Sequence, residues 1–327
     1  MMRRYRAWLS AAALAVLLAV GAWAALEYPQ NPAKRITIDP GWSTARIAEH
    51  LEAEGLVRDA AYFRWRAAGQ SLKAGTYDIP ANISVGELVA LLAEGRTVRD
   101  WVTVTIPEGW TLEQMADRVA ELGIADRAAF FQALAVAKPP AGVEGKLPPG
   151  NRRLEGYLYP DTYRLQKGDG ANELIALMRR RFDEVAKELA IPPQRLHEVV
   201  TIASMVEREA KRPEERRRIA GVIYNRLKKG MKLQIDATVQ YALGKHKERL
   251  LYEDLKVDSP YNTYRYPGLP PGPIAAPGRG ALEAALHPER HDFYYYVARP
   301  DGSHVFSKTY EEHLRRIREI RRAAGSS

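Results

Sequence analysis

Residues 201–210, TIASMVEREA, form the most apolar part of a segment that predicts a helix over residues 195–210. Such a segment is expected to be buried, and yet it ends in two carboxylates, Glu207 and Glu209. Either the helix reaches solvent at this end, or a carboxylic acid is held in a dry place. The second arrangement is one that catalysis uses, because burial keeps an acid protonated.

Helical periodicity separates the two glutamates. At 3.6 residues per turn, Glu207 continues the column that Leu196, Val200 and Ala203 form, whereas Glu209 lies roughly opposite. Desolvation on the apolar column raises the pKa of a carboxyl group, so Glu207 is the candidate general acid. The alternative, a structural glutamate paired with an arginine such as Arg208 or Arg212, stays open at this point.

Composition limits the classes of function. The chain has 327 residues, no cysteine and a formal net charge of +9. Absence of cysteine excludes disulfides, thiolate nucleophiles and zinc–thiolate sites. The basic residues are scattered and accompany no nucleic-acid-binding motif, so we expect no nucleic-acid partner. No phosphate loop, HExxH or GxSxG motif is present and the histidines are dispersed, which predicts no cofactor and no metal.

The N-terminus predicts a membrane anchor. Three arginines lie within residues 1–6, and residues 7–26 carry no charge over about twenty positions, long enough for a transmembrane helix. The arginines favour a cytoplasmic tail at 1–6, which places the remainder outside the cytoplasm. The alternative is a cleaved signal peptide, since Ala22-Trp23-Ala24 has the form of a cleavage site.

Two segments resemble each other: residues 36–63 and 104–131 align at an offset of 68. Each predicts a short strand, a Gly-Trp turn and a helix whose N-cap is Ser43 or Thr111. A unit of this kind resembles a LysM-type carbohydrate-binding module. We therefore expect one LysM-like module over residues 35–99 and a second half-module, or connecting subdomain, over 100–137. Trp42 and Trp110 either stack on sugars or fill the interior of their modules.

Residues 138–150 are rich in Pro and Gly and predict a linker or exposed loop before a domain over residues 151–327. Within that domain, polar side chains interrupt apolar and aromatic runs, which suits a groove for a neutral sugar polymer. The candidate substrate-binding residues are Asn225, Gln234, Asp236, Thr238, Tyr261, Asn262, Thr263 and Tyr264.

Six motifs, in chain order, strongly resemble the YceG-like family of endolytic murein transglycosylases. They are LEGYLYPDTY, ASMVEREA, GVIYNRLKKGMKLQIDATVQYALG, SPYNTYRYPGLPPGPIAAPG, ALHPERHDFYYYVA and GSHVFSKTYEEH. The resemblance implies an α+β protein: an N-terminal transmembrane helix, LysM-like modules and a mixed α/β catalytic domain outside the plasma (inner) membrane of a bacterium. The family's essential acid is the first of its ASxxExE motif, which is Glu207 here. One departure is Ala237, where the family usually has Pro between Asp and Thr; the polar groups are kept.

The reaction that the resemblance implies is cleavage of the MurNAc–GlcNAc β-1,4 bond of nascent peptidoglycan strands, leaving 1,6-anhydroMurNAc ends and terminating elongation. The expected partners are the glycan strands, the membrane and peptidoglycan synthases. Two alternatives stay open: a hydrolytic muramidase that pairs Glu207 with Asp236 or Glu209, and a non-catalytic scaffold that binds peptidoglycan.

Overall fold

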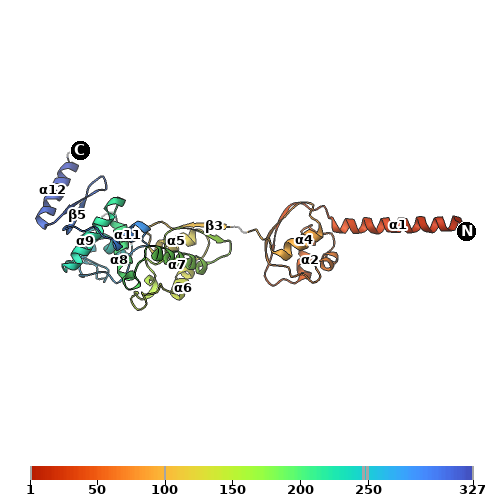
Figure 1. The fold of residues 1–327 in the computed structure, drawn as a ribbon, viewed down its shortest axis with the longest axis horizontal. Helices are drawn as coiled ribbons and strands as arrows, with labels where there is room; N and C mark the ends of the chain where they lie inside the picture. The colour runs from red at the N-terminus through yellow and green to blue at the C-terminus, as the bar shows by residue number, and fades with distance from the viewer. Residues whose placement is uncertain (1, 99–100, 245–246, 248–249, 326–327) are drawn as a thin grey trace. The chain divides into compact units, whose positions relative to one another are not determined.

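The structure is a computed structural model that describes residues 2–98, 101–244, 247 and 250–325. Side chains are described from residue 12 to residue 323 within these ranges. The chain divides into two compact units, Met1–Asp100 and Trp101–Ser327, and each is considered by itself (Figure 1). Helices and two-stranded antiparallel sheets together make the fold α+β, as expected.

The first unit is a small α+β module that follows a long N-terminal helix. Its elements are α1 (Met2–Glu27), β1 (Lys34–Ile38), α2 (Thr44–Ala53), α3 (Ala60–Arg66), β2 (Gly75–Ile79) and α4 (Val85–Glu94). Strands β1 and β2 pair antiparallel, with Lys34 opposite Ile79, and the helices cover one core. The predicted N-cap holds: Ser43 accepts a hydrogen bond from the Arg46 N–H.

The expected membrane span, residues 7–26, lies within α1, but the side chains of residues 7–11 are outside the described set. Among the residues that could be searched, we find no helix with the length and apolar content that a membrane crossing requires.

The second unit opens with a copy of the same pattern. Strand β3 (Trp101–Thr105) leads to α5 (Leu112–Glu121) and α6 (Arg127–Val136). Helix α5 lies 68 residues after α2, the offset of the sequence repeat, and Thr111 caps it together with Gln114. The strand that pairs with β3 is β4 (Thr162–Gln166), which comes from beyond the Pro/Gly-rich segment. The second copy is thereby closed by residues from the following half of the chain.

Helix α8 is the centre of the second half of this unit. The remaining helices in chain order are α7 (Ala171–Glu188), α8 (Leu196–Glu209), α9 (Arg216–Lys228), α10 (Asp236–Leu243) and α11 (Arg279–Leu286). Leu196 and the eight consecutive residues from Val199 to Val206 are buried in α8, and α9 and α11 pack against this helix. The predicted buried helix at residues 195–210 is confirmed.

The Pro-, Gly- and Tyr-rich segment between α10 and α11 is an ordered loop. The Ser204 hydroxyl of α8 accepts a hydrogen bond from the Ile274 N–H at 3.0 Å, and Asn262 is fully buried. After α11, strands β5 (Tyr295–Ala298) and β6 (His304–Ser307) form a hairpin, and α12 (Tyr310–Gly325) packs on it.

Candidate active site

Glu207 lies in the last turn of α8 and keeps only 7% of its side-chain exposure. Its Oε1 accepts a hydrogen bond from Arg216 Nη2 at 3.3 Å, and its Oε2 accepts one from the Gly278 N–H at 2.9 Å. Burial raises the pKa of Glu207 above its ordinary value, although the Gly278 N–H and Arg216 act in the opposite direction. The predicted apolar column is real, because Leu196, Val200 and Ala203 are all buried.

A second carboxylate approaches Glu207 from the turn between β3 and α5. Glu108 Oε2 lies 3.7 Å from Arg216 Nη2, the same atom that contacts Glu207. The next residue, Gly109, has a φ of 76°, and a Cβ built on it would lie 3.8 Å from Glu207 Cγ, which places this turn beside the acid. The β3–α5 turn and the end of α8, about a hundred residues apart in sequence, therefore meet at Glu207. Arg208 Nη1 also donates a hydrogen bond to the Gly109 carbonyl at 3.1 Å, which holds this turn in place.

Glu209, the other glutamate of the motif, belongs to a separate polar cluster. Its Oε2 accepts a hydrogen bond from the Tyr296 hydroxyl at 3.0 Å, and burial raises its pKa. The exposed Asp236, at the first turn of α10, accepts a hydrogen bond from the Tyr264 hydroxyl and repels the Glu209 charge. Both carboxylates thus have phenol donors within the protein.

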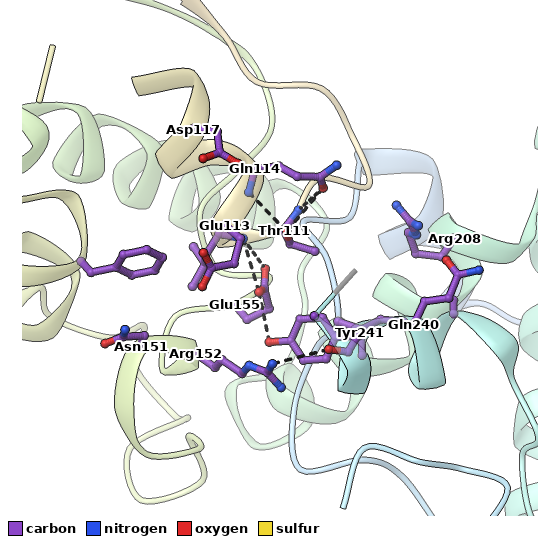
Figure 2. A pocket seen from close by; sticks show the side chains of 15 residues that line it. Thr111, Glu113, Gln114, Asp117, Asn151, Arg152, Glu155, Arg208, Gln240 and Tyr241 are labelled. Carbon is purple, nitrogen blue, oxygen red and sulfur yellow. Dashed lines mark hydrogen bonds between the residues drawn. The ribbon is translucent and has the colours of Figure 1, made fainter. Parts of the chain in front are cut away.

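A cavity of about 420 Å³ opens beside Arg208, the residue that follows Glu207 (Figure 2). It is bounded by α5, the 150–155 turn, α10 and the end of α8, with Arg208 and Ile274 on its wall. Glu207 is not among its lining residues. The polar residues that line it are Thr111, Glu113, Gln114, Asp117, Asn151, Arg152, Glu155, Arg208 and Gln240.

Glu155, which lines this cavity, is a buried acid that the sequence reasoning missed. It is 2% exposed, and its two oxygens accept hydrogen bonds from the Leu112 N–H and the Tyr241 hydroxyl, each at 3.1 Å (Figure 2). Burial raises the pKa of Glu155 to about 8. Its only sequence signal was its place among apolar and aromatic residues at the start of the motif LEGYLYPDTY.

The candidate substrate-binding residues lie on α9, around the start of α10 and in the loop after α10, and they differ in accessibility. Thr238, Tyr261, Asn262 and Thr263 are buried. The Asn262 amide donates to the Leu255 and Val257 carbonyls, at 2.9 and 2.8 Å.

The hydroxyls of Thr238 and Thr263 lie 2.9 Å apart. The Asn225 amide donates to the His291 and Phe293 carbonyls. Gln234 and Asp236 are exposed and Tyr264 partly so; these three offer polar groups at the surface.

Trp42 and Trp110 occupy equivalent places in the two copies of the repeat. Each is partly buried and packs on the core of its own unit. Each also carries a guanidinium over its ring: Arg46 at 4.7 Å and Arg118 at 5.3 Å from the ring centroids. An arginine on the ring face leaves less of it available to a sugar.

The geometry defines the class of the site. One carboxylic acid is desolvated at a helix end, held by one cation and one backbone N–H, and lies near a cavity. This is the arrangement of an acid–base centre rather than of a metal or phosphate site. Its supporting groups, Glu108, Arg216 and Gly278, come from distant segments and were not found by sequence reasoning.

The chain belongs to the YceG-like family, whose family model matches residues 36–319. The resemblance inferred from the motifs is therefore confirmed. The chain is 34% identical over 306 residues to the endolytic murein transglycosylase of Bacillus subtilis (strain 168), covering 88% of this chain and 85% of that protein.

It is 33% identical over 331 residues to the endolytic murein transglycosylase of Streptococcus pneumoniae serotype 2, covering 90% of this chain and 60% of that protein. The crystal structure of a putative yceG-like protein from Listeria monocytogenes superposes with a TM-score of 0.58 at 36% identity. The match covers 86% of this chain and 99% of that one.

Proposed function

We propose that this protein is an endolytic peptidoglycan lytic transglycosylase, a lyase, in which Glu207 is both general acid and general base. Two relatives that bear this name match most of the chain. The observation that carries the assignment of the residue is the burial of Glu207, because its raised pKa favours the protonated form that a general acid needs.

The reaction needs one carboxyl group. Glu207 gives its proton to the GlcNAc O4 as the bond from MurNAc C1 to that oxygen breaks. The MurNAc C6 hydroxyl then bonds to C1, and its proton returns to Glu207, leaving a 1,6-anhydroMurNAc end. No water is consumed, because proximity of the internal hydroxyl replaces an activated water. Between the two steps Glu207 is an anion, which Arg216 and the Gly278 N–H stabilise.

The accessible polar groups Gln234, Asp236 and Tyr264 are the candidates for contact with the glycan. The buried members of the predicted set, such as Asn262 and Thr263, are proposed to have an indirect role. Their hydrogen bonds hold the loop between α10 and α11 in the conformation that the glycan would meet. Trp42 and Trp110 stay candidates for sugar stacking at the edges that their arginines leave uncovered.

We further propose that residues 7–26 anchor the protein in the plasma membrane of a bacterium with the two units outside. The apolar side chains of α1 are exposed, as Leu14, Leu17 and Leu18 show at 59%, 68% and 66%. The β1–α2–α3–β2 module, residues 35–99, is proposed to be LysM-like, with 100–137 a second such half and 151–327 the catalytic domain. Peptidoglycan synthases that make the nascent strand are proposed partners.

Products separate this function from its rivals. Digestion of peptidoglycan by the full-length protein should release anhydro-ended fragments, each 18 mass units lighter than the hydrolysis product by loss of one water. Reducing MurNAc ends would instead indicate a muramidase using Asp236 or Glu209 as the second carboxylate. No release at all, with glycan binding retained, would indicate a scaffold.

A further inference from the structure

The acid Glu207 has a carboxylate neighbour to which the single-acid reaction gives no task. We propose that Glu108 is a positioning residue for Glu207, dividing the charge of Arg216 between two carboxylates so that Glu207 holds its proton more firmly than it would beside Arg216 alone. This inference rests on the proposed function for its consequence, but its physical content concerns only the three side chains.

The first observation is the shared cation. Arg216 Nη2 lies 3.3 Å from Glu207 Oε1 and 3.7 Å from Glu108 Oε2. Within the described part of the chain, no other carboxylate lies within 4.0 Å of this guanidinium. One positive charge, 20% exposed, thus serves two negative charges. If Glu108 were neutral, Arg216 would act on Glu207 alone and would favour its ionised form.

The second observation is the fit between Glu108 and Gly278. A Cβ on Gly278 would lie 1.8 Å from Glu108 Oε1, so a larger residue at 278 would force the Glu108 carboxylate to move. The φ of Gly278 is −78°, which any residue adopts, so backbone conformation does not require a glycine there. The glycine instead leaves room for the Glu108 carboxylate in its present position. The same Gly278 donates its N–H to Glu207, so one residue accommodates both acids.

Groups from three other elements surround Glu207 in the described part of the chain. Glu108 comes from the β3–α5 turn, Arg216 from α9, and the Gly278 N–H from the start of α11; Arg208 follows on its own helix and bonds to the Gly109 carbonyl. Burial and Glu108 raise the pKa of Glu207, while Gly278 and Arg216 lower it. The Glu108 side chain is 48% exposed, whereas that of Glu207 is 7% exposed.

The test compares two variants with opposite expected signs. Glu108→Gln removes the competing carboxylate, so the high-pH limb of the pH–rate profile should move to lower pH, by on the order of one unit. At a pH above the limb, such a shift lowers the rate about tenfold. Arg216→Gln should move the same limb to higher pH. Glu108→Asp keeps the charge and should restore most of the wild-type profile.

Direct titration keeps the inference separate from the function. The carboxyl ¹³C signal of Glu207, assigned through Glu207→Gln, should titrate at lower pH in Glu108→Gln than in the wild type. Absence of glycan cleavage by the wild type would sink the proposed function and leave this titration valid. An unchanged or upward-moved Glu207 titration in Glu108→Gln would overturn the inference, as would a loss of rate with no movement of the limb. If Glu108→Gln did not fold, two other variants would decide the matter. Arg216→Gln should move the high-pH limb to higher pH, and Glu108→Asp should keep it close to its wild-type position.

Discussion

Glu155 gives the most quantitative prediction, because it is a buried acid whose pKa lies far from its ordinary value. The native protein retains the Glu155 proton up to about pH 8, whereas the unfolded chain releases it near 4.5. Between these values the unfolded state binds fewer protons, so the free energy of unfolding falls as pH rises. Below pH 4.5 Glu155 is protonated in both states, so it no longer contributes to the pH dependence of the free energy of unfolding.

The size of this pH effect follows from the one proton that Glu155 releases on unfolding. That proton lowers the free energy of unfolding by at most about 1.4 kcal/mol per pH unit, or roughly 3 kcal/mol between pH 5 and pH 7. Glu155→Gln preserves the shape: the amide oxygen can accept from the Leu112 N–H, and the amide nitrogen can donate to the Tyr241 oxygen. The variant should therefore gain stability relative to the wild type as pH increases.

The assay is urea unfolding followed by circular dichroism at several pH values. The difference in slope between variant and wild type matters, since Glu207 and Glu209 also have raised pKa values and contribute in the same direction. Glu173→Gln is the matched control, because Glu173 is exposed on α7 and its carboxylate stays in water. Parallel slopes for Glu155→Gln and the wild type would refute the reasoning.

Four further substitutions test packing, three of them around the site and one in the first unit. Asn262→Ala leaves the Leu255 and Val257 carbonyls unpaired and should lower the free energy of unfolding by about 2–4 kcal/mol in urea titrations; a change below about 0.5 kcal/mol would contradict the buried network. Gly278→Ala should lower the free energy of unfolding by less than about 1 kcal/mol, because only the half-exposed end of the Glu108 side chain has to move. Glu108→Ala should remove this cost, and strict additivity of the two would show that these side chains do not meet. Trp42→Ala should destabilise the first unit by about 3 kcal/mol in thermal melts, whereas lost glycan binding at unchanged stability would indicate a surface for sugars.

Local signals in the sequence predicted much of the fold. Helix α8 follows from its apolar periodicity, and the N-caps Ser43 and Thr111 mark the starts of α2 and α5. The sequence repeat predicted the same strand, turn and helix in both copies, and α2 and α5 do lie at the 68-residue offset of that repeat. These features depend on neighbours within one or two turns, which a single sequence displays.

Long-range contacts could not be predicted in this way. Strand β4 closes the second copy from beyond a Pro/Gly-rich segment, and nothing local assigns Thr162 to Thr105. The start of α10 was also missed, because Ile235 at its N-cap offers no capping side chain. A sequence shows that Asn262 is polar, but not whether its partner is a ligand or a carbonyl five residues away.

The site also combines a feature that the sequence predicts with contacts that it does not. The burial of Glu207 follows from the column that it continues, a property of one helix. Its partners Glu108, Arg216 and Gly278 lie in three other segments, and only the folded chain brings them together. The separation of Glu209 into a cluster with Tyr296 likewise depends on the hairpin at the far end of the chain.

The most direct test of the central claim is the muropeptide mass spectrum produced by the full-length protein and by Glu207→Gln, with Glu209→Gln as a matched control on the same helix. We expect anhydro-ended fragments from the wild type, a loss of roughly 10² to 10⁴ in their rate of release for Glu207→Gln, and release retained by Glu209→Gln. Fragments released by Glu207→Gln at the wild-type rate, with the protein folded, would contradict the account.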